Sequence, residues 1–226
     1  MNIIKVPNVN HALHDAVWLL KTSGVKETSR NGPVLVAPGP VATVYTRPWE
    51  RVLFLPERDA NPVFHLIETI WMLAGSNDVM KLLPFNGNYA QYAEDDGVVW
   101  GAYGHRWLRH FPHTTNQLAY IISELRAAPN TRRAVLSMWD PISDLGAPRR
   151  DVPCNTHAYF DLRDGKLNMT VCNRSNDVIW GAYGANVVHF SMLQELIAGA
   201  LGVPMGQYVQ FSNNFHIYTE NPVAIR

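Results

Sequence analysis

The chain has 226 residues, of which 47% are hydrophobic, and its 19 basic residues balance its 19 acidic ones. This length permits one sizeable core, and the composition excludes an intrinsically disordered chain. A chain without net charge lacks the basic excess of a general nucleic-acid binder, although a few local arginines can still hold a small anionic ligand.

Cys154 and Cys172 are the only cysteines. Two cysteines make neither a disulfide framework nor a zinc site of recognisable spacing, so we expect no metal centre. The N-terminus has no long apolar core or small-residue cleavage site, and no apolar stretch approaches the length of a membrane span. We therefore expect a cytoplasmic protein whose thiols stay reduced.

Helical and alternating patterns divide the first part of the chain. Apolar residues recur at helical spacing from Asn10 to Lys21, which predicts a helix capped by Asn10 and ended near Gly24. Residues 34–55 alternate and contain several Pro and Gly, as is typical of twisted strands joined by turns. A strong helix is predicted to start at Pro62 and to stop at Gly75.

Residues 76–106, rich in Gly, Asn, Asp and Tyr, predict a long irregular segment of the kind that is often functional. The tetrapeptide at 163–166 is a hairpin signal. The remaining predicted elements are, in order, a helix at 116–127, strands at 134–139, 156–162 and 167–173, a helix at 185–201 and an extended segment at 208–218. With no linker and no repeat, the pattern favours one α+β domain over residues 1–226.

The pair Pro153-Cys154 is followed, at a distance that fits a strand and a turn, by the run Asn173-Arg174-Ser175-Asn176-Asp177. Together these residues supply a thiol, a guanidinium, hydroxyl and amide donors, and a carboxylate. Positive charge lowers the pKa of a thiol, and arginine grips phosphate through two parallel hydrogen bonds. We therefore expect a reactive Cys154 beside a bound anion.

Glu68 is a second candidate for chemistry. Its helical neighbours Phe64, Trp71 and Met72 are all apolar. A carboxyl group in such surroundings is expected to have a raised pKa, which suits proton transfer near neutral pH.

The motifs together resemble the thymidylate synthase and deoxycytidylate hydroxymethylase family. Asp164-Gly165-Lys166-Leu167 lies ten residues after Cys154 and leads into Arg174-Ser175-x-Asp177-Val178-x-x-Gly181. Six further matches follow the family's order: Glu68 in the helix ending Trp71-x-x-x-Gly75, Tyr103-Gly104-x-x-Trp107, Arg132-Arg133, Trp139-Asp140, Asn186, and His216-x-Tyr218. The resemblance extends from about Arg30 to Tyr218.

The resemblance implies a large mixed β-sheet packed against helices, and a two-fold dimer formed through the sheet. It also implies a reaction in which the Cys154 thiolate adds to carbon 6 of a pyrimidine deoxynucleotide. Carbon 5 then attacks the methylene group of the co-substrate 5,10-methylenetetrahydrofolate, without a metal.

The same resemblance assigns roles to the other candidates. Arg174 and Ser175 are expected to hold the 5′-phosphate, with Arg132 and Arg133 contributed by the second subunit and Arg30 joining from an N-terminal loop. Tyr103 is expected to assist removal of the carbon-5 proton, and Asp177 to fix the base or the folate. The two residues of an extended segment that share one face, His216 and Tyr218, are expected to bind the sugar 3′-hydroxyl.

Asn186 is expected to choose the base. A carboxamide can accept from N3–H and donate to O4, which matches uracil and favours dUMP. The spacing from Gly181 to Asn186 is one residue longer than is usual in the family. This insertion can displace the carboxamide, so dCMP stays open as the substrate.

Three departures from the synthase pattern favour a different product. Tyr89 and Tyr92 stand where synthases carry a tryptophan pair at the folate site, Asn176 replaces a small residue, and Asn155 replaces a histidine. A dry wall protects the exocyclic methylene intermediate until hydride arrives, whereas a hydroxyl-bearing side chain admits or orients water. We therefore expect dUMP hydroxymethylation, with thymidylate synthesis and dCMP hydroxymethylation as the alternatives.

Two other functional classes have weaker support. Cys154 and His216 with an Asn are compatible with a cysteine hydrolase, but no local signature surrounds the thiol. An inactive nucleotide- or RNA-binding homologue is disfavoured by the neutral charge and by the presence of Cys154 and Glu68. The chain ends eight residues after Tyr218, where family members usually continue into a segment that closes over folate, so we expect this closure segment to be missing or replaced.

Overall fold

The computed structural model describes residues 1–111 and 116–221. One eight-stranded sheet has the order β1-β4-β8-β7-β6-β5, and a β2–β3 hairpin joins it through pairing of β3 with β8. The strands are β1 (Asn2–Val6), β2 (Val25–Ser29), β3 (Gly32–Val36), β4 (Val41–Tyr45), β5 (Val135–Ser137), β6 (Asn155–Arg163), β7 (Lys166–Asp177) and β8 (Met205–Tyr218). The sheet is mixed, because β1 runs parallel to β4 and β7 parallel to β8, while the other pairs are antiparallel.

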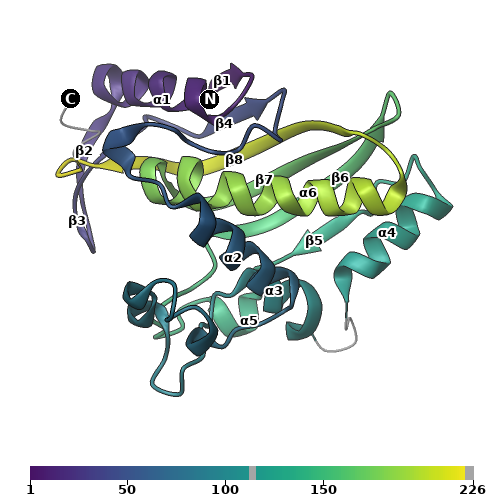
Figure 1. Ribbon diagram of the computed structural model, residues 1–226. Coiled ribbons are helices and arrows are strands. Elements are labelled where there is room, and N and C mark those ends of the chain that lie inside the picture. The colour runs from purple at the N-terminus through teal and green to yellow at the C-terminus, as the bar shows by residue number, and fades with distance from the viewer. Residues whose placement is uncertain (112–115, 222–226) are drawn as a thin grey trace.

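The helices are α1 (Val9–Ser23), α2 (Pro62–Leu73), α3 (Tyr103–His105), α4 (Gln117–Ala127), α5 (Pro141–Asp144) and α6 (Val187–Leu201). In Figure 1, α6 lies lengthwise along the central strands and α2 crosses below it. The core forms where the apolar side of α6, including Phe190, Leu193 and Ile197, packs onto β7 and β8. No helix in the described ranges is long and apolar enough to cross a membrane.

The sheet has two unlike faces, as the alternation along β7 shows. Leu167, Met169 and Val171 are buried, whereas the intervening Thr170 and Cys172 are only partly covered. Because successive side chains of a strand point to opposite faces, the second set lies on the face away from α6.

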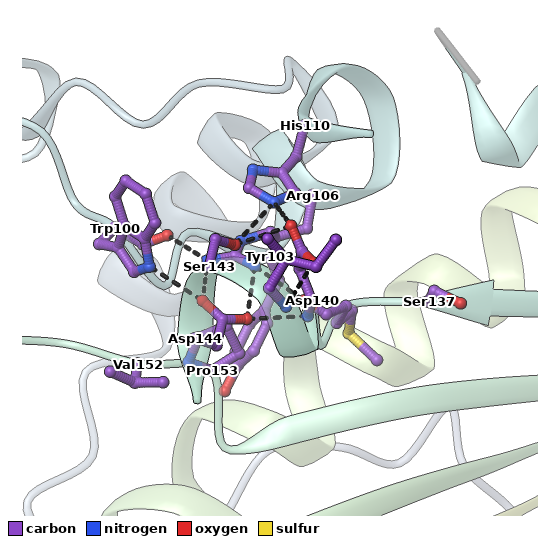
Figure 2. A network of polar contacts seen from close by, with 12 residues as sticks. Trp100, Tyr103, Arg106, His110, Ser137, Asp140, Ser143, Asp144, Val152 and Pro153 are labelled. Carbon is purple, nitrogen blue, oxygen red and sulfur yellow. Dashed lines mark hydrogen bonds and ion pairs between the residues drawn. The ribbon is translucent and has the colours of Figure 1, made fainter. Parts of the chain in front are cut away.

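A buried ion pair fixes the segment that carries Tyr103 (Figure 2). Arg106 makes two hydrogen bonds to the Asp144 carboxylate, of 2.7 and 2.8 Å, and both side chains have no exposed surface. Asp144 also accepts from the Trp100 indole at 2.9 Å and from the Asp140 backbone N–H at 2.9 Å. A buried pair of this kind is strongly destabilising when only one partner is removed, so residues 100–106 and 140–144 are held as one unit.

A close backbone contact joins this unit to α2. A Cβ at Gly104 would overlap the Met72 carbonyl oxygen, so only glycine fits there. Gly104 therefore brings Tyr103 up to the helix that carries Glu68.

Most of the predicted elements are confirmed, including the α+β class, the helices at 116–127 and 62–73 and the hairpin after β6. In that hairpin Asp164 and Gly165 both adopt positive φ, as a tight turn requires. The strands β1 and β2 were not predicted: each has only five residues, and the turn signal Asn31-Gly32 after β2 was overlooked. Three expectations are wrong in detail: the N-cap of α1 is Asn8 rather than Asn10, no strand continues from Tyr45 to Leu55, and residues 76–106 contain short helical turns.

Candidate active site

Cys154 lies at the entrance of β6, and the Tyr103 hydroxyl anchors its backbone. That oxygen accepts hydrogen bonds from the N–H groups of Cys154 and Asn155, both of 3.2 Å. The direction of the Tyr103 O–H is set by these two contacts, because both use the lone pairs of its oxygen. The predicted neighbourhood of Cys154 and Tyr103 is therefore present.

Arg174 is folded over the loop that precedes the thiol. Its Nε donates to the Pro153 carbonyl at 2.9 Å, and one terminal nitrogen donates to the Val152 carbonyl at 3.0 Å. Its backbone N–H donates to the Cys154 carbonyl at 2.9 Å, so β7 is paired to Cys154 itself. A guanidinium has five N–H donors, so donors remain for an anion.

The expected lowering of the thiol pKa is wrong for this arrangement. Burial raises the pKa of Cys154, and the charge of Asp151 raises it further, against the opposing effects of Arg174 and Arg30. The sequence argument counted the arginines but not the burial or the third, acidic neighbour.

Asp151 was missed by the sequence reasoning. Burial raises its pKa to about 6, although Arg174, the backbone N–H of Gly101, Arg106 and Arg30 all act to lower it. A Cβ at Gly101 would overlap Asp151 Oδ2, so the glycine makes room for the carboxyl group. No motif marks this aspartate, and only its position three residues before Cys154 hints at it.

Glu68 is bound from two sides by residues of other elements. The Tyr89 hydroxyl donates to Glu68 Oε1 at 2.6 Å, and His189 Nε2 of α6 lies 3.0 Å from Glu68 Oε2. The side chain of Glu68 is buried, with 7% exposure of the residue.

The predicted rise in the pKa of Glu68 is also wrong. Burial acts to raise the pKa, but the interaction with His189 and the hydrogen bond from Tyr89 outweigh it, and the pKa lies below its usual value. The helical neighbours are apolar as expected, yet His189 lies on a different helix, far along the chain, and could not be read from α2. Glu68 is therefore held as a carboxylate.

Tyr89 and Tyr92 lie on the short helical turn Gly87–Tyr92, with ring centroids 5.4 Å apart. Tyr89 also contacts the rings of Phe64 and Trp71. Burial, followed by the charge of Glu68, raises the pKa of the Tyr89 hydroxyl, so it stays a hydrogen-bond donor. This hydroxyl is the polar group that the sequence comparison with synthases singled out.

Asn186 ends a π-helical segment, Val178–Asn186, that leads directly into α6. A π-helical turn holds more residues than an α-turn, so it can absorb a single inserted residue without displacing the helix after it. Asn186 is buried, and its Oδ1 accepts from Asn155 Nδ2 at 3.1 Å. The insertion noted in the sequence therefore does not remove Asn186 from the neighbourhood of Cys154.

Asp177 caps the same π-helical segment. Its Oδ1 accepts from the N–H groups of Ile179 at 3.0 Å and Trp180 at 2.6 Å. Its Oδ2 is buried and has no hydrogen-bond partner among the described residues. Burial raises the pKa of Asp177, while the Trp180 N–H and the charge of His216 lower it.

The strand pairing of β7 with β8 sets His216 directly beside Asp177. Burial lowers the pKa of His216, and its Nδ1 lies 2.7 Å from Asn214 Oδ1. The rings of His216 and Tyr218 are 5.6 Å apart, so the predicted shared face is confirmed.

Residues 54–225 match the family model described as thymidylate synthase. The chain belongs to the thymidylate synthase family. The solved structure of thermostable thymidylate synthase A from Bacillus subtilis superposes with a TM-score of 0.77 at 22% identity, covering 94% of this chain and 80% of that one. The large mixed sheet packed against helices is therefore the thymidylate synthase fold that the sequence predicted.

Two phage proteins called deoxyuridylate hydroxymethyltransferase are similar to this chain. The protein of Pseudomonas phage M6 is 53% identical over 227 residues, covering 99% of this chain and 64% of that protein. The protein of Bacillus phage SP01 is 39% identical over 192 residues, covering 80% of this chain and 50% of that protein. A putative thymidylate synthase of Methanosarcina acetivorans is 38% identical over 116 residues, covering 51% of this chain and 52% of that protein. The chain thus spans between half and two thirds of the length of these relatives.

The other arginines that were predicted to bind phosphate in this thymidylate synthase family member lie in two places. Arg30, at the exposed turn between β2 and β3, is close enough for its charge to act on Asp151 and Cys154. Arg132 and Arg133 lie exposed between α4 and β5, and Arg133 pairs with Glu124 of its own chain at 2.8 Å. Ser175 lies on β7 next to Arg174 and pairs in register with Asn214 of β8.

The donor set of the site suits an organic co-substrate. The unpartnered Asp177 Oδ2 is an acceptor that matches the N–H groups of a pterin ring. Within residues 1–111 and 116–221, no group of three or more His, Cys, Asp or Glu side chains is arranged to hold a metal. Folate, which the family uses, fits the free acceptor at Asp177.

Proposed function

We propose that this chain transfers a one-carbon unit from 5,10-methylenetetrahydrofolate to carbon 5 of dUMP and that water completes the reaction, giving 5-hydroxymethyl-dUMP. The hydrogen bond from Tyr89 to Glu68 carries this proposal, because it puts a hydroxyl group at a synthase tryptophan position and joins it to the Glu68 carboxylate. The names of the two phage relatives point to the same reaction.

In the first step the Cys154 thiolate adds to carbon 6 of the uracil ring, and Arg174 and Arg30 supply the charge that favours the thiolate. Asn186 accepts from N3–H and donates to O4. Folate supplies the methylene carbon that becomes bonded to carbon 5. Tyr103, already hydrogen bonded to the backbone of the nucleophile, assists removal of the carbon-5 proton. The electron pair left on carbon 5 forms the double bond to the methylene carbon, whose bond to nitrogen breaks, so that tetrahydrofolate leaves and the nucleotide carries an exocyclic methylene group.

In the second step water attacks the exocyclic methylene group of the nucleotide. The water oxygen bonds to that carbon, its proton passes to Glu68, and the electron pair returns to the ring before the Cys154 sulfur leaves carbon 6. A low pKa suits Glu68 to this role, since a carboxylate accepts the proton and a carboxylic acid does not.

The other proposed contacts follow the layout of the site. Arg174, Ser175 and Arg30 bind the 5′-phosphate, and His216 and Tyr218 bind the sugar. Tyr89, Tyr92 and Asp177 contact the folate, with the free Asp177 Oδ2 accepting from the pterin.

We further propose a two-fold dimer through the sheet. The partly covered face of β7, with Thr170 and Cys172, supports it, because a face without helices needs a partner to be buried. In such a dimer Arg132 and Arg133 reach the partner's phosphate site. For Arg133 this requires that the phosphate competes with Glu124.

Separate incubation of dUMP and of dCMP with 5,10-methylenetetrahydrofolate tests the proposed reaction. The expected result is a product of dUMP heavier by one formaldehyde equivalent, with no dihydrofolate formed, because no hydride is consumed. One dihydrofolate per nucleotide converted would instead mean methylation and would defeat the hydroxymethylase assignment. Faster turnover of dCMP would defeat the choice of base.

A further inference from the structure

Four asparagine side chains, one of which is that of Asn186, form a closed ring of hydrogen bonds. Asn186 Nδ2 donates to Asn176 Oδ1 at 3.1 Å, and Asn176 Nδ2 donates to Asn173 Oδ1 at 3.1 Å. Asn173 Nδ2 donates to Asn155 Oδ1, and Asn155 Nδ2 donates back to Asn186 Oδ1 at 3.1 Å. All four residues are buried, and three of them are 2% exposed or less.

The ring consumes half of the hydrogen-bonding capacity of each amide. A carboxamide has two N–H donors and two oxygen lone pairs, and every member spends one of each on its neighbours. Asn186 thus keeps one donor and one acceptor for a ligand. The ring fixes which side of the amide carries the donor and which the acceptor. If the Asn186 amide turned over, its oxygen would face Asn176 Oδ1 and its nitrogen would face Asn155 Nδ2.

The direction of the ring is fixed from outside it. Asn176 Nδ2 also donates to Gln210 Oε1 at 3.2 Å and to Ser212 Oγ at 2.9 Å. Gln210 cannot turn over, because its Nε2 donates to the Ala182 backbone carbonyl at 3.3 Å, and a carbonyl oxygen only accepts. Reversal of all four amides would therefore set Asn176 Oδ1 against Gln210 Oε1.

We propose that this asparagine ring locks the polarity of the Asn186 amide and thereby makes the site select uracil over cytosine, with Asn155, Asn173 and Asn176 as positioning residues. The inference rests on the proposed function, in which Asn186 pairs with the base. Uracil presents an acceptor at O4 and a donor at N3, whereas cytosine presents a donor at N4 and an acceptor at N3. An asparagine amide that is free to rotate by half a turn can pair with either base, whereas one that is held in the ring pairs only with uracil.

The inference also explains two departures from the synthase pattern. Asn155 and Asn176 are the residues that replace a histidine and a small side chain, and both contact Asn186 directly. Without them the ring could not close. Asn155 and Asn176 therefore serve recognition of the base, whatever the route by which water reaches the methylene carbon.

The test compares the dissociation constants of dUMP and dCMP, measured by titration calorimetry without folate. The variants Asn173→Ser and Asn176→Ser each open the ring at residues that do not contact the base. Gln194→Leu is the matched control, because Gln194 is an equally buried amide that donates to the Leu167 and Gln207 carbonyls outside the ring. Thermal unfolding shows whether each variant is folded. One folded ring variant is enough for the test.

We expect the wild-type protein to bind dUMP more tightly and the ring variants to lose at least about fivefold of this preference, mainly through tighter dCMP binding, since one or two hydrogen bonds no longer oppose the flip. The control should keep the wild-type ratio. A merely structural role would change both affinities together, so an unchanged ratio in folded ring variants would overturn the inference and leave the proposed substrate intact. A wild-type protein without preference for dUMP would overturn both.

Discussion

The Tyr89 hydroxyl donates a hydrogen bond of 2.6 Å to Glu68 Oε1, although the partly buried Tyr89 and the buried Glu68 belong to separate elements. Such a contact couples the residue at a synthase tryptophan position to Glu68, the proposed acid–base group. A charged acceptor makes it one of the stronger hydrogen bonds of the site.

Replacement of Tyr89 by Phe should therefore slow the reaction more than it weakens binding. Loss of a hydrogen bond to a charged group costs roughly 1.5–3 kcal/mol, so we expect the rate of product formation to fall about ten- to hundredfold. Nucleotide affinity should change little, because Tyr89 faces Glu68 rather than the base. Single-turnover kinetics with dUMP measures the rate and the affinity separately.

Tyr89→Trp serves as the companion variant. It restores the bulk of the synthase residue without the hydroxyl, so water capture should slow in the same way. An unchanged rate in both variants would show that Tyr89 takes no part in delivering water.

His189→Gln should alter the pH dependence of the reaction. The His189 interaction is a main reason why the pKa of Glu68 lies below its usual value, after burial, which acts the other way. Removing it raises the pKa, so the acid limb of the pH–rate profile should move to higher pH. His14→Gln, on the exposed surface of α1, is the control and should leave the limb in place.

The site shows which features of the molecule can be read from the order of residues. Cys154, Arg174 and Asp177 lie at the ends of strands or in short motifs, so their spacing alone predicts that they meet. Glu68 lies on the predicted helix, and its apolar neighbours also predict its burial. The sequence of that helix does not reveal His189, which lies on α6 and approaches Glu68 from a distant part of the chain.

The same reason explains the missed Asp151 and asparagine ring. Each depends on side chains that approach across several strands, such as Asn155 on β6 and Asn173 on β7, whose register includes a shift near Asn155. Comparison with the synthase pattern identified Asn155 and Asn176 as departures. Only the three-dimensional arrangement shows that both hold Asn186.

Asp151 should make stability depend on pH. Its pKa is about 6 in the folded protein against 3.8 for the ordinary group, so the folded state binds the proton more tightly than the unfolded state. The charged carboxylate consequently destabilises the fold as the pH rises from about 4 to 6, and above that range the cost amounts to up to about 3 kcal/mol.

Asp151→Asn removes this cost. The variant should exceed the wild type in free energy of unfolding at pH 8, and the difference should vanish near pH 4, as measured by urea titration. Glu27→Gln, on the exposed strand β2, should show no such dependence. If the difference in free energy of unfolding between the wild type and Asp151→Asn were the same at pH 4 and pH 8, the raised pKa of Asp151 would be contradicted.

Cys154 should be the residue that forms a covalent adduct with the nucleotide. Incubation with 5-fluoro-dUMP and 5,10-methylenetetrahydrofolate should label wild-type protein and Cys172→Ala, because Cys172 lies on the sheet face away from α6. Cys154→Ala should form no adduct and should still bind dUMP. Peptide mass spectrometry locates the label, and its appearance on Cys172 would refute the assignment of the nucleophile.

Mixed dimers test whether Arg132 acts on the partner's site. Cys154→Ala and Arg132→Ala homodimers should each be inactive or strongly impaired, because each lacks one part of both shared sites. In a heterodimer one site combines both defects and the other has neither, so mixing should restore activity toward one competent site per dimer. Mixing Cys154→Ala with Arg174→Ala gives the same kind of rescue only if Arg174 also crosses, and its hydrogen bonds to Val152 and Pro153 within one chain predict that it does not. Heterodimers that form, as judged by differently tagged chains, yet show no rescue with Arg132→Ala would place that arginine in its own chain's site or outside the site altogether.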